Sequence, residues 1–180
     1  KMVTEQNDRL SKMVKTLLDM SELQTVGRDE KIIVDALIDE VLEDLEPLAQ
    51  EKNIKLIGKC KDITMIGSDI LIYRLVYNLV ENAIKYNHLG GQVTVTAYQK
   101  EKQIYLSVED TGNGIPEDLR ERVFEPFFRV DKSRSRELGG VGLGLALVRE
   151  IVRVHDGSIT VRANPSGGTI FDVMFTQGYI

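Results

Sequence analysis

The stretch VTVTAYQKEKQIYLSV, residues 93–108, decides the fold because apolar and polar residues alternate through it twice. Its apolar residues stand at every second position in each half: Val93, Val95 and Ala97, then Ile104, Leu106 and Val108. A period of two residues is typical of a strand that buries one face. The stretch therefore predicts two neighbouring strands joined by a polar turn at residues 100–102, and one face of their sheet needs a covering layer.

Patterns on both sides of this stretch supply the covering layer and complete the sheet. Apolar residues with helical spacing occupy residues 35–51, a segment from the cap residue Ser68 or Asp69 to about Tyr86, and a segment from about Gly142 to Val154. Further strands are predicted at residues 31–34, 54–58, 63–66, 158–162 and 169–175. This order predicts an α+β fold, a two-layer α/β sandwich with a mixed, largely antiparallel sheet packed on helices.

A short amphipathic helix precedes the sandwich. Its apolar seam consists of Leu10, Met13, Leu17 and Met20. The seam covers about two heptads, and a helix of that length is marginal alone in water, so we expect it to pack against a partner helix. The pattern ends at Gly27, which divides the chain into residues 1–27 and a domain of residues 28–180. Because the chain begins with Lys1 inside a helical pattern, we expect it to be a fragment of a longer protein.

The composition argues against several classes of protein. The 180 residues carry a net charge of −5 with both signs interspersed, so we expect no nucleic acid partner. No apolar run approaches the roughly 18 residues that span a membrane, so we expect no membrane contact by this fragment. A single cysteine, Cys60, excludes an internal disulfide and predicts a cytoplasmic location.

The stretch GGVGLGLAL, residues 139–147, is a glycine-rich segment that leads into a predicted helix. It fits neither G-x-x-x-x-G-K-[ST] nor G-x-G-x-x-G. Gly140, Gly142 and Gly144 would let the backbone approach a ligand closely, and the helix N-terminus behind them favours an anion. The alternative is a glycine-rich turn that only packs the helix tightly on the sheet.

Two further segments carry polar side chains that suit a nucleotide. In NLVENAIKY, residues 78–86, Asn78, Asn82 and Lys85 fall within about 60° of one another on a helix, and an amide oxygen there could ligate Mg²⁺. In EDTGNGIPE, residues 109–117, Asp110 follows a strand and could accept the amino group of adenine beside a glycine backbone. The alternatives are a solvated helix face and a simple turn.

A basic loop follows FEPFFR, residues 124–129, which ends in Arg129. It could close over a polyphosphate, or it could be an ordinary surface loop.

Together and in this order, the four segments and GGTIF, residues 167–171, resemble the catalytic ATP-binding domain of sensor histidine kinases. The superfamily also holds DNA gyrase, the heat-shock chaperone ATPases and the MutL repair proteins, and its α/β sandwich is known as the Bergerat fold. The resemblance covers about residues 30–176. Residues 1–27 resemble the end of the second helix of the dimerisation and phosphotransfer hairpin. The family binds ATP between the helical layer and a mobile lid, here about residues 126–141.

The resemblance implies a role for each site residue. Asn82 would ligate Mg²⁺ with help from Asn78, and the catalytic residues would be Arg129, Lys85 and Asn78. Asp110 would bind the adenine amino group with Thr169 behind it. The remaining nucleotide contacts would be made by Tyr86, Gly112, Gly114, Gly140, Gly142, Leu143 and Gly144.

The implied function is transfer of the γ-phosphoryl group of ATP to a histidine on the hairpin, and from there to an aspartate of a response regulator receiver domain. The full-length protein would be a homodimer anchored in a bacterial membrane. Neither His88 nor His155 has the setting of the phosphoacceptor, and we expect His155 to be a structural residue at a helix end. Val141 replaces a frequent threonine, and residues 87–91 replace the family's usual Thr-Pro-x-Gly-Gly.

Two alternatives remain. A hydrolytic ATPase of the superfamily would need a glutamate where this chain has Asn78. A module that only binds nucleotide, or that acts mainly as a phosphatase, would keep the same fold.

Overall fold

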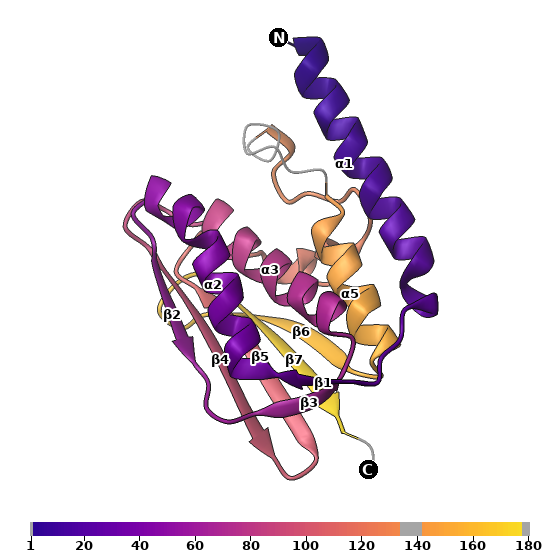
Figure 1. The fold of residues 1–180 in the computed structure, drawn as a ribbon. Coiled ribbons are helices and arrows are strands. Elements are labelled where there is room, and N and C mark those ends of the chain that lie inside the picture. The colour runs from indigo at the N-terminus through magenta and orange to yellow at the C-terminus, as the bar shows by residue number, and fades with distance from the viewer. Residues whose placement is uncertain (1, 134–141, 178–180) are drawn as a thin grey trace.

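The computed structural model describes residues 2–133 and 142–177, and it folds as helices packed on one face of a sheet (Figure 1). The helices are α1 (Met2–Glu22), α2 (Val34–Glu51), α3 (Asp69–Lys85) and α5 (Gly144–Val154), with 3₁₀ turns η1 (Leu23–Thr25), η2 (Glu117–Leu119) and η3 (Arg122–Phe124). The strands are β1 (Glu30–Ile33), β2 (Lys55–Lys59), β3 (Thr64–Gly67), β4 (Gln92–Lys100), β5 (Gln103–Asp110), β6 (Ser158–Ala163) and β7 (Thr169–Thr176).

The main sheet has the strand order β2-β4-β5-β7-β6. Strand β2 runs parallel to β4, and the remaining neighbours are antiparallel. Within the β4–β5 hairpin Val95 pairs with Val108 and Ala97 with Leu106, and these four side chains are buried under the helices. The predicted two-layer α+β sandwich with a mixed, largely antiparallel sheet is confirmed. Strands β1 and β3 were predicted as strands, but their pairing was not predicted. They form a small antiparallel sheet of their own.

Helix α3 lies at the centre of the helical layer and contacts both α2 and α5. The Ser68 side chain caps its N-terminus, where Oγ accepts a hydrogen bond from the Leu71 N–H at 3.4 Å. A stripe of almost fully buried apolar side chains holds the helix on the sheet: Ile72, Leu75, Val76, Leu79, Val80 and Ile84. Because this stripe fixes the rotation of α3 about its axis, the helix flank beside it has a defined direction.

Helix α1 extends to 21 residues, which is longer than the two heptads that the seam predicts. The structure also divides the predicted seam. Met20 packs against the core, whereas Leu10 and Leu17 remain exposed on the outer side of the helix. No helix within the described residues combines the length and the apolar character needed to cross a membrane.

Helix α5 begins at Gly144, two residues later than predicted. The reason is Gly142, which has a φ of +77° in the left-handed region, so the backbone turns there and cannot yet be helical.

His155 stands at the C-terminal cap of α5 and links it to α3. Its Nδ1 lies 2.8 Å from the carbonyl oxygen of Ile151, so Nδ1 carries the proton and donates. Its Nε2 then accepts a hydrogen bond from the N–H of Ser68, the cap residue of α3, at 3.0 Å. Burial lowers the pKa of His155, and the charge of Arg28 acts in the same direction. The neutral ring therefore joins the ends of two helices.

We expect the free energy of unfolding to decrease as the pH falls below about 6.5, the ordinary pKa of histidine. The unfolded chain binds the proton in this range, whereas folded His155 has a lowered pKa and must lose its bond from Ser68 when it is protonated. The stabilisation is therefore complete above that pH and is lost as the pH falls toward the lower, folded pKa. Urea unfolding between about pH 8 and pH 5.5 measures it.

The variant His155→Gln should flatten this dependence, because the amide does not titrate. His88→Gln is the matched control, since the chain has two histidines, and it should keep the dependence of the unmodified protein. An unchanged pH profile in His155→Gln would contradict the prediction.

Candidate functional site

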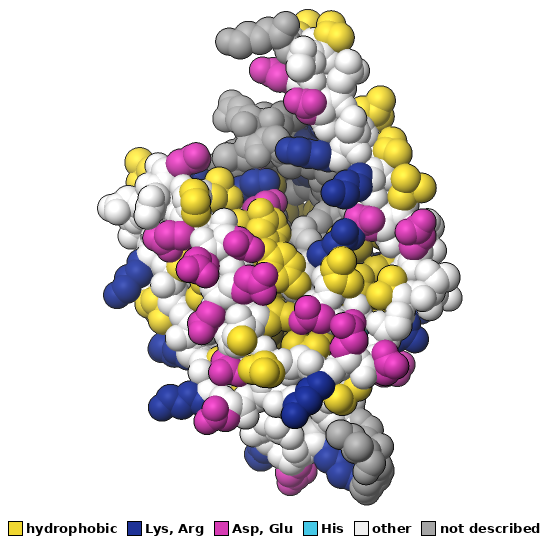
Figure 2. All heavy atoms as spheres, viewed as in Figure 1, with side chains coloured by type: hydrophobic (Ala, Val, Ile, Leu, Met, Phe, Trp, Pro, Cys, Tyr) yellow, Lys and Arg dark blue, Asp and Glu magenta, His cyan; other side chains and the backbone are white. Residues whose placement is uncertain are grey.

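A cavity of about 760 Å³ opens between the helical layer and the loops at one end of the sheet. Its walls come from α1, α3, the end of β5, the loops around residues 113–116 and 128–131, and the start of α5. Figure 2 shows a hollow beside α1, with Lys and Arg side chains gathered along the side that α1 forms. Cavities of about 300–1,000 Å³ are typical of sites for small organic ligands.

The polar flank of α3 faces this cavity, and the structure brings Asn78, Asn82 and Lys85 together there. The Asn78 Nδ2 donates to the carbonyl oxygen of Arg74 at 2.7 Å, which leaves its Oδ1 directed at the start of α5. Lys85 forms an ion pair with Glu81 at 3.0 Å. Among the described residues the Asn82 side chain makes no hydrogen bond, so its amide oxygen is available to a cation.

Asp110 ends β5, lines the cavity from the sheet layer and is only 8% exposed. Its Oδ1 accepts hydrogen bonds from the N–H groups of Gly112 at 2.8 Å and Thr169 at 3.2 Å. No hydrogen bond within the described part of the chain reaches Oδ2. Burial raises the pKa of Asp110, which the two N–H donors oppose and the charge of Glu109 reinforces. One carboxylate oxygen is thus fixed to the backbone while the other can accept from a ligand.

The turn between β6 and β7 supports Asp110 from behind. Asn164 donates through Nδ2 to the carbonyl oxygen of Asp110 at 2.9 Å and to Glu109 at 3.0 Å. Gly168, with a φ of +103°, packs directly against the Asp110 backbone, where a Cβ would overlap it. Thr169 lies behind Asp110, where the resemblance puts it, and it also lines the cavity. Asn164 was not predicted, because no local pattern distinguishes it from other turn residues.

The loop after β5 packs against the C-terminal end of α3. The N–H of Asn113 donates to the carbonyl oxygen of Tyr86 at 3.3 Å, and Tyr86 and Gly114 line the cavity. Gly112 does not line the cavity; a Cβ on it would lie 2.5 Å from the Tyr86 carbonyl oxygen. The glycine at 112 is therefore required by close backbone packing beside Asp110.

Lys52 fixes the same end of α3 from the α2 side. Its Nζ donates to the carbonyl oxygens of Lys85 at 2.6 Å, Asn87 at 3.2 Å and Ile84 at 3.4 Å. A cation at these carbonyls also suits the negative end of the helix dipole. Lys52 was missed by the sequence analysis, because it is 33 residues from its main partner and follows an ordinary helix end.

Gly142 and Gly144 line the part of the cavity formed by the start of α5. Arg129 belongs to the adjacent loop and also lines the cavity. The carbonyl oxygen of Gly142 accepts from the N–H of Phe127 at 2.7 Å, which joins this turn to the FEPFFR segment. Leu143 is fully buried, so its side chain belongs to the core and only its backbone could meet a ligand. Of the predicted lid, about residues 126–141, the part from residue 134 to residue 141, which includes Gly140 and Val141, lies outside the described residues.

Several cavity residues were not predicted. Arg74, Tyr77 and Glu81 lie on α3 and line the cavity beside Asn78. Helical spacing could have found Arg74 and Glu81, which stand four residues before Asn78 and Lys85. Tyr77 directly precedes Asn78 and has no such spacing to the predicted site residues. Lys12, Lys15, Thr16 and Asp19 of α1 also line it, and no local signal indicates that α1 would reach the site.

The arrangement suits an adenine nucleotide. A buried acceptor at one end can select an exocyclic amino group, and the glycine turn, the amide flank and the basic side chains at the other end suit phosphates. Within the described residues no cluster of three or more His, Cys, Asp or Glu side chains could hold a metal ion by itself. The unbonded oxygen of Asn82 fits Mg²⁺ that keeps most of its ligands from water and phosphate.

Comparison with known proteins identifies the family of this chain. Residues 67–178 match the family of histidine kinase-, DNA gyrase B- and HSP90-like ATPases. The chain is 36% identical over 176 residues to the sensor histidine kinase RppB of a Synechocystis species, covering 95% of this chain and 39% of RppB. It is 37% identical over 181 residues to the sensor-like histidine kinase SenX3 of Mycolicibacterium smegmatis, covering 98% of this chain and 47% of SenX3. The chain therefore spans less than half of either relative.

The fold is also found in a crystal structure of the histidine kinase ThkA in complex with the response regulator protein TrrA. The superposition has a TM-score of 0.79 at 26% identity and covers 98% of this chain and 50% of that chain. The shared region includes α1 as well as the sandwich, since it takes in nearly the whole chain.

We expect Gly112→Ala to weaken the binding of ATP by about fivefold or more, because the new Cβ must displace the Tyr86 carbonyl and overpacking costs about 1–3 kcal/mol. Calorimetric titration measures the affinity. Gly27→Ala is the matched control, since its Cβ would meet a single side-chain atom, of Asp29, at 3.4 Å. Equal affinities in the two variants would show that the loop after β5 does not shape the ligand site.

Proposed function

We propose a function from the premise that this chain belongs to the histidine kinase-, DNA gyrase B- and HSP90-like ATPase family, in which it is the ATP-binding catalytic domain of a sensor histidine kinase. In the whole protein this domain binds Mg-ATP and transfers the γ-phosphoryl group to a histidine of the dimerisation hairpin. The phosphoryl group then passes to an aspartate of a response regulator.

One observation carries this proposal. A single cavity joins the available Oδ2 of Asp110 to the amide flank of Asn78 and Asn82 and to the glycine turn at Gly142. A purine amino group and a polyphosphate can therefore occupy different parts of one site. That combination would select adenine, and the terminal phosphate would lie toward Arg129, which lines the same cavity.

The residues of this chain position the phosphates and neutralise their charge. Asn82 would hold Mg²⁺ through its amide oxygen with Asn78 next to it, and a bound Mg²⁺ supplies positive charge to the phosphates. Arg129 would stabilise the charge on the transferred group. Lys85 would either break its ion pair with Glu81 and contact a phosphate directly, or act on the phosphates while the pair stays intact. The nucleophile is the imidazole of the hairpin, so the domain needs no covalent residue of its own.

The amide side chain of Asn78 favours kinase chemistry over hydrolysis. An amide cannot take a proton from water, and its Nδ2 is already bonded to the carbonyl oxygen of Arg74. The site therefore lacks a base at the position where hydrolytic relatives of the superfamily have glutamate.

The partners and the location of the parent protein follow the same proposal. We propose that the parent is a homodimer through its hairpin, that it serves a response regulator receiver domain, and that this domain works in the cytoplasm beneath a membrane-anchored sensor. The complex of ThkA with TrrA supports the regulator partner by likeness.

Asp110→Asn should reduce the affinity for ATP by at least about tenfold, in line with about 1.5–3 kcal/mol for a hydrogen bond to a charged group. The amide Oδ1 can keep the bonds from Gly112 and Thr169, which leaves Nδ2 as a donor facing the donor amino group of adenine. Inosine triphosphate carries an acceptor oxygen at that position, so the preference for ATP over ITP should shrink or reverse.

Competition between ATP and ITP for a fluorescent nucleotide measures this preference. The exposed Asp118 supplies the control variant Asp118→Asn, which should bind like the unmodified chain. Unchanged ATP preference in Asp110→Asn would exclude Asp110 as the adenine acceptor.

Phosphotransfer is tested with γ-labelled ATP, Mg²⁺ and a separately produced hairpin that carries the acceptor histidine. The unmodified chain should label the hairpin, and Arg129→Ala should lose about 100-fold in rate while it retains most of its affinity for ATP. Arg162→Ala is the control, because Arg162 pairs with Asp172 between β6 and β7. A chain that binds ATP but never labels the hairpin would support the module that only binds nucleotide.

A further inference from the structure

Helix α1 forms one wall of the nucleotide cavity. Its cavity-lining residues are Lys12, Lys15, Thr16 and Asp19, which fall on one face because they are spaced three and four apart. The exposed apolar residues Leu10, Val14, Leu17 and Leu18 occupy a different face of the same helix. The helix therefore presents a polar, mainly basic face to the cavity, and this face is distinct from its apolar surface.

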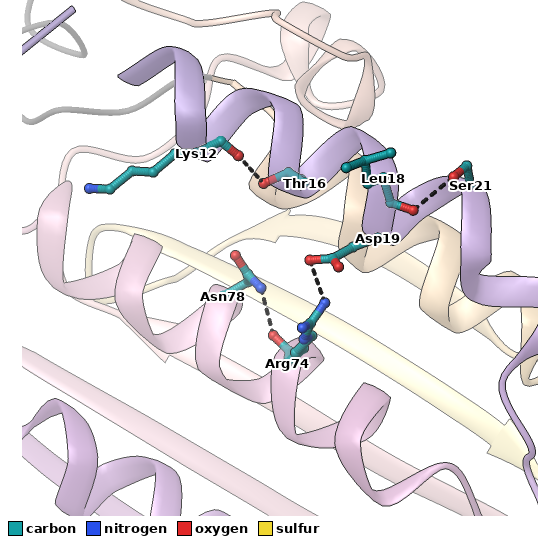
Figure 3. A network of polar contacts seen from close by, with 7 residues as sticks. All are labelled: Lys12, Thr16, Leu18, Asp19, Ser21, Arg74 and Asn78. Atoms are coloured by element: carbon teal, nitrogen blue, oxygen red, sulfur yellow. Dashed lines mark hydrogen bonds and ion pairs between the residues drawn. The ribbon is translucent and has the colours of Figure 1, made fainter. Parts of the chain in front are cut away.

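An ion pair holds this wall in place. Asp19 Oδ2 lies 2.6 Å from an Nη atom of Arg74 on α3, and both side chains are more than two-thirds buried. Figure 3 shows the two side chains pointing toward each other across the gap between α1 and α3. The carbonyl oxygen of the same Arg74 accepts from Asn78. The contact between the helices thus lies one helical turn from a residue assigned to the phosphates.

The cations of the cavity differ in how they are paired. Arg74 is paired with Asp19, and Lys85 is paired with Glu81. Across residues 2–133 and 142–177, no ion pair joins Lys12 or Lys15 to a carboxylate. These two ammonium groups lie at the exposed rim of the cavity, where they keep their hydration until an anion arrives.

We propose that Lys12 and Lys15 bind the polyphosphate of the nucleotide, so that α1 is part of the binding site. This inference rests on the proposed function, because it assumes that the cavity takes ATP. Lysine suits the role, since a flexible stem carries a compact charge that can follow the phosphates without a fixed geometry. The pair Asp19–Arg74 acts as a positioning contact that keeps both lysines at the cavity.

A reciprocal effect follows. If docked α1 strengthens the binding of ATP, then ATP must strengthen the docking of α1 by the same free energy. Bound ATP should therefore slow amide hydrogen exchange in α1. It should do so less in Asp19→Asn, where the helix loses its charged partner on α3.

The experiment titrates the full chain with ATP, ADP and AMP by calorimetry. The double variant Lys12→Gln/Lys15→Gln should bind ATP about fivefold to tenfold more weakly, ADP should be affected less, and AMP should be unaffected. Added salt should reduce the difference, because the ammonium groups are exposed. Lys61→Gln, at an exposed position between β2 and β3, is the matched control and should bind all three nucleotides normally.

The outcomes separate this inference from the proposed function. If the unmodified chain binds no adenine nucleotide, the proposed function itself fails. If it binds ATP and the double variant binds ATP equally well, or if ATP leaves hydrogen exchange in α1 unchanged, then α1 is only a packing neighbour and the inference is overturned. Circular dichroism of each variant checks that α1 remains helical.

Discussion

The site depends on the way α3 is fixed against the sheet. A buried stripe that includes Leu75, Leu79 and Ile84 prevents the helix from turning about its axis, and each end of the helix has a further support. The N-terminal cap Ser68 is bonded to His155 of α5, and the C-terminal carbonyls are bonded to Lys52 after α2. A small rotation would carry the amide flank away from Asp110, since the two sides of the cavity are supplied by different layers.

Local sequence patterns were sufficient to predict the helical layer, the sheet and most of the polar flank of α3. Strand alternation and helical spacing depend on neighbouring residues, so β4, β5 and α3 were predicted close to their true bounds. The glycine turn before α5 was predicted as well, although the left-handed Gly142 delays the start of the helix. The roles assigned to the site residues stay predictions, although the structure brings Asn78, Asn82, Lys85 and Asp110 to one cavity.

The parts that were missed are those set by contacts between distant segments. Asp19 and Arg74 are 55 positions apart in the sequence, and nothing near either residue indicates that they meet. Asn164 and Lys52 are likewise ordinary polar residues until the fold brings them to Asp110 and to the end of α3. Leu143 shows the opposite case, because a residue inside a glycine segment turns its side chain to the core.

The two faces of α1 also constrain how phosphotransfer could occur. Its basic face lines the cavity, whereas Leu10, Val14 and Leu17 lie exposed on another side of the helix. A partner helix that covers the apolar face would be separated from the cavity by α1 itself. The terminal phosphate could then reach a histidine on that partner only after the domain moved relative to α1, which would break the pair between Asp19 and Arg74. If ATP binds as proposed, the arrangement described here would retain it. Leaving this arrangement costs the attraction between Asp19 and Arg74, and the hydration of the two separated charges offsets part of that cost.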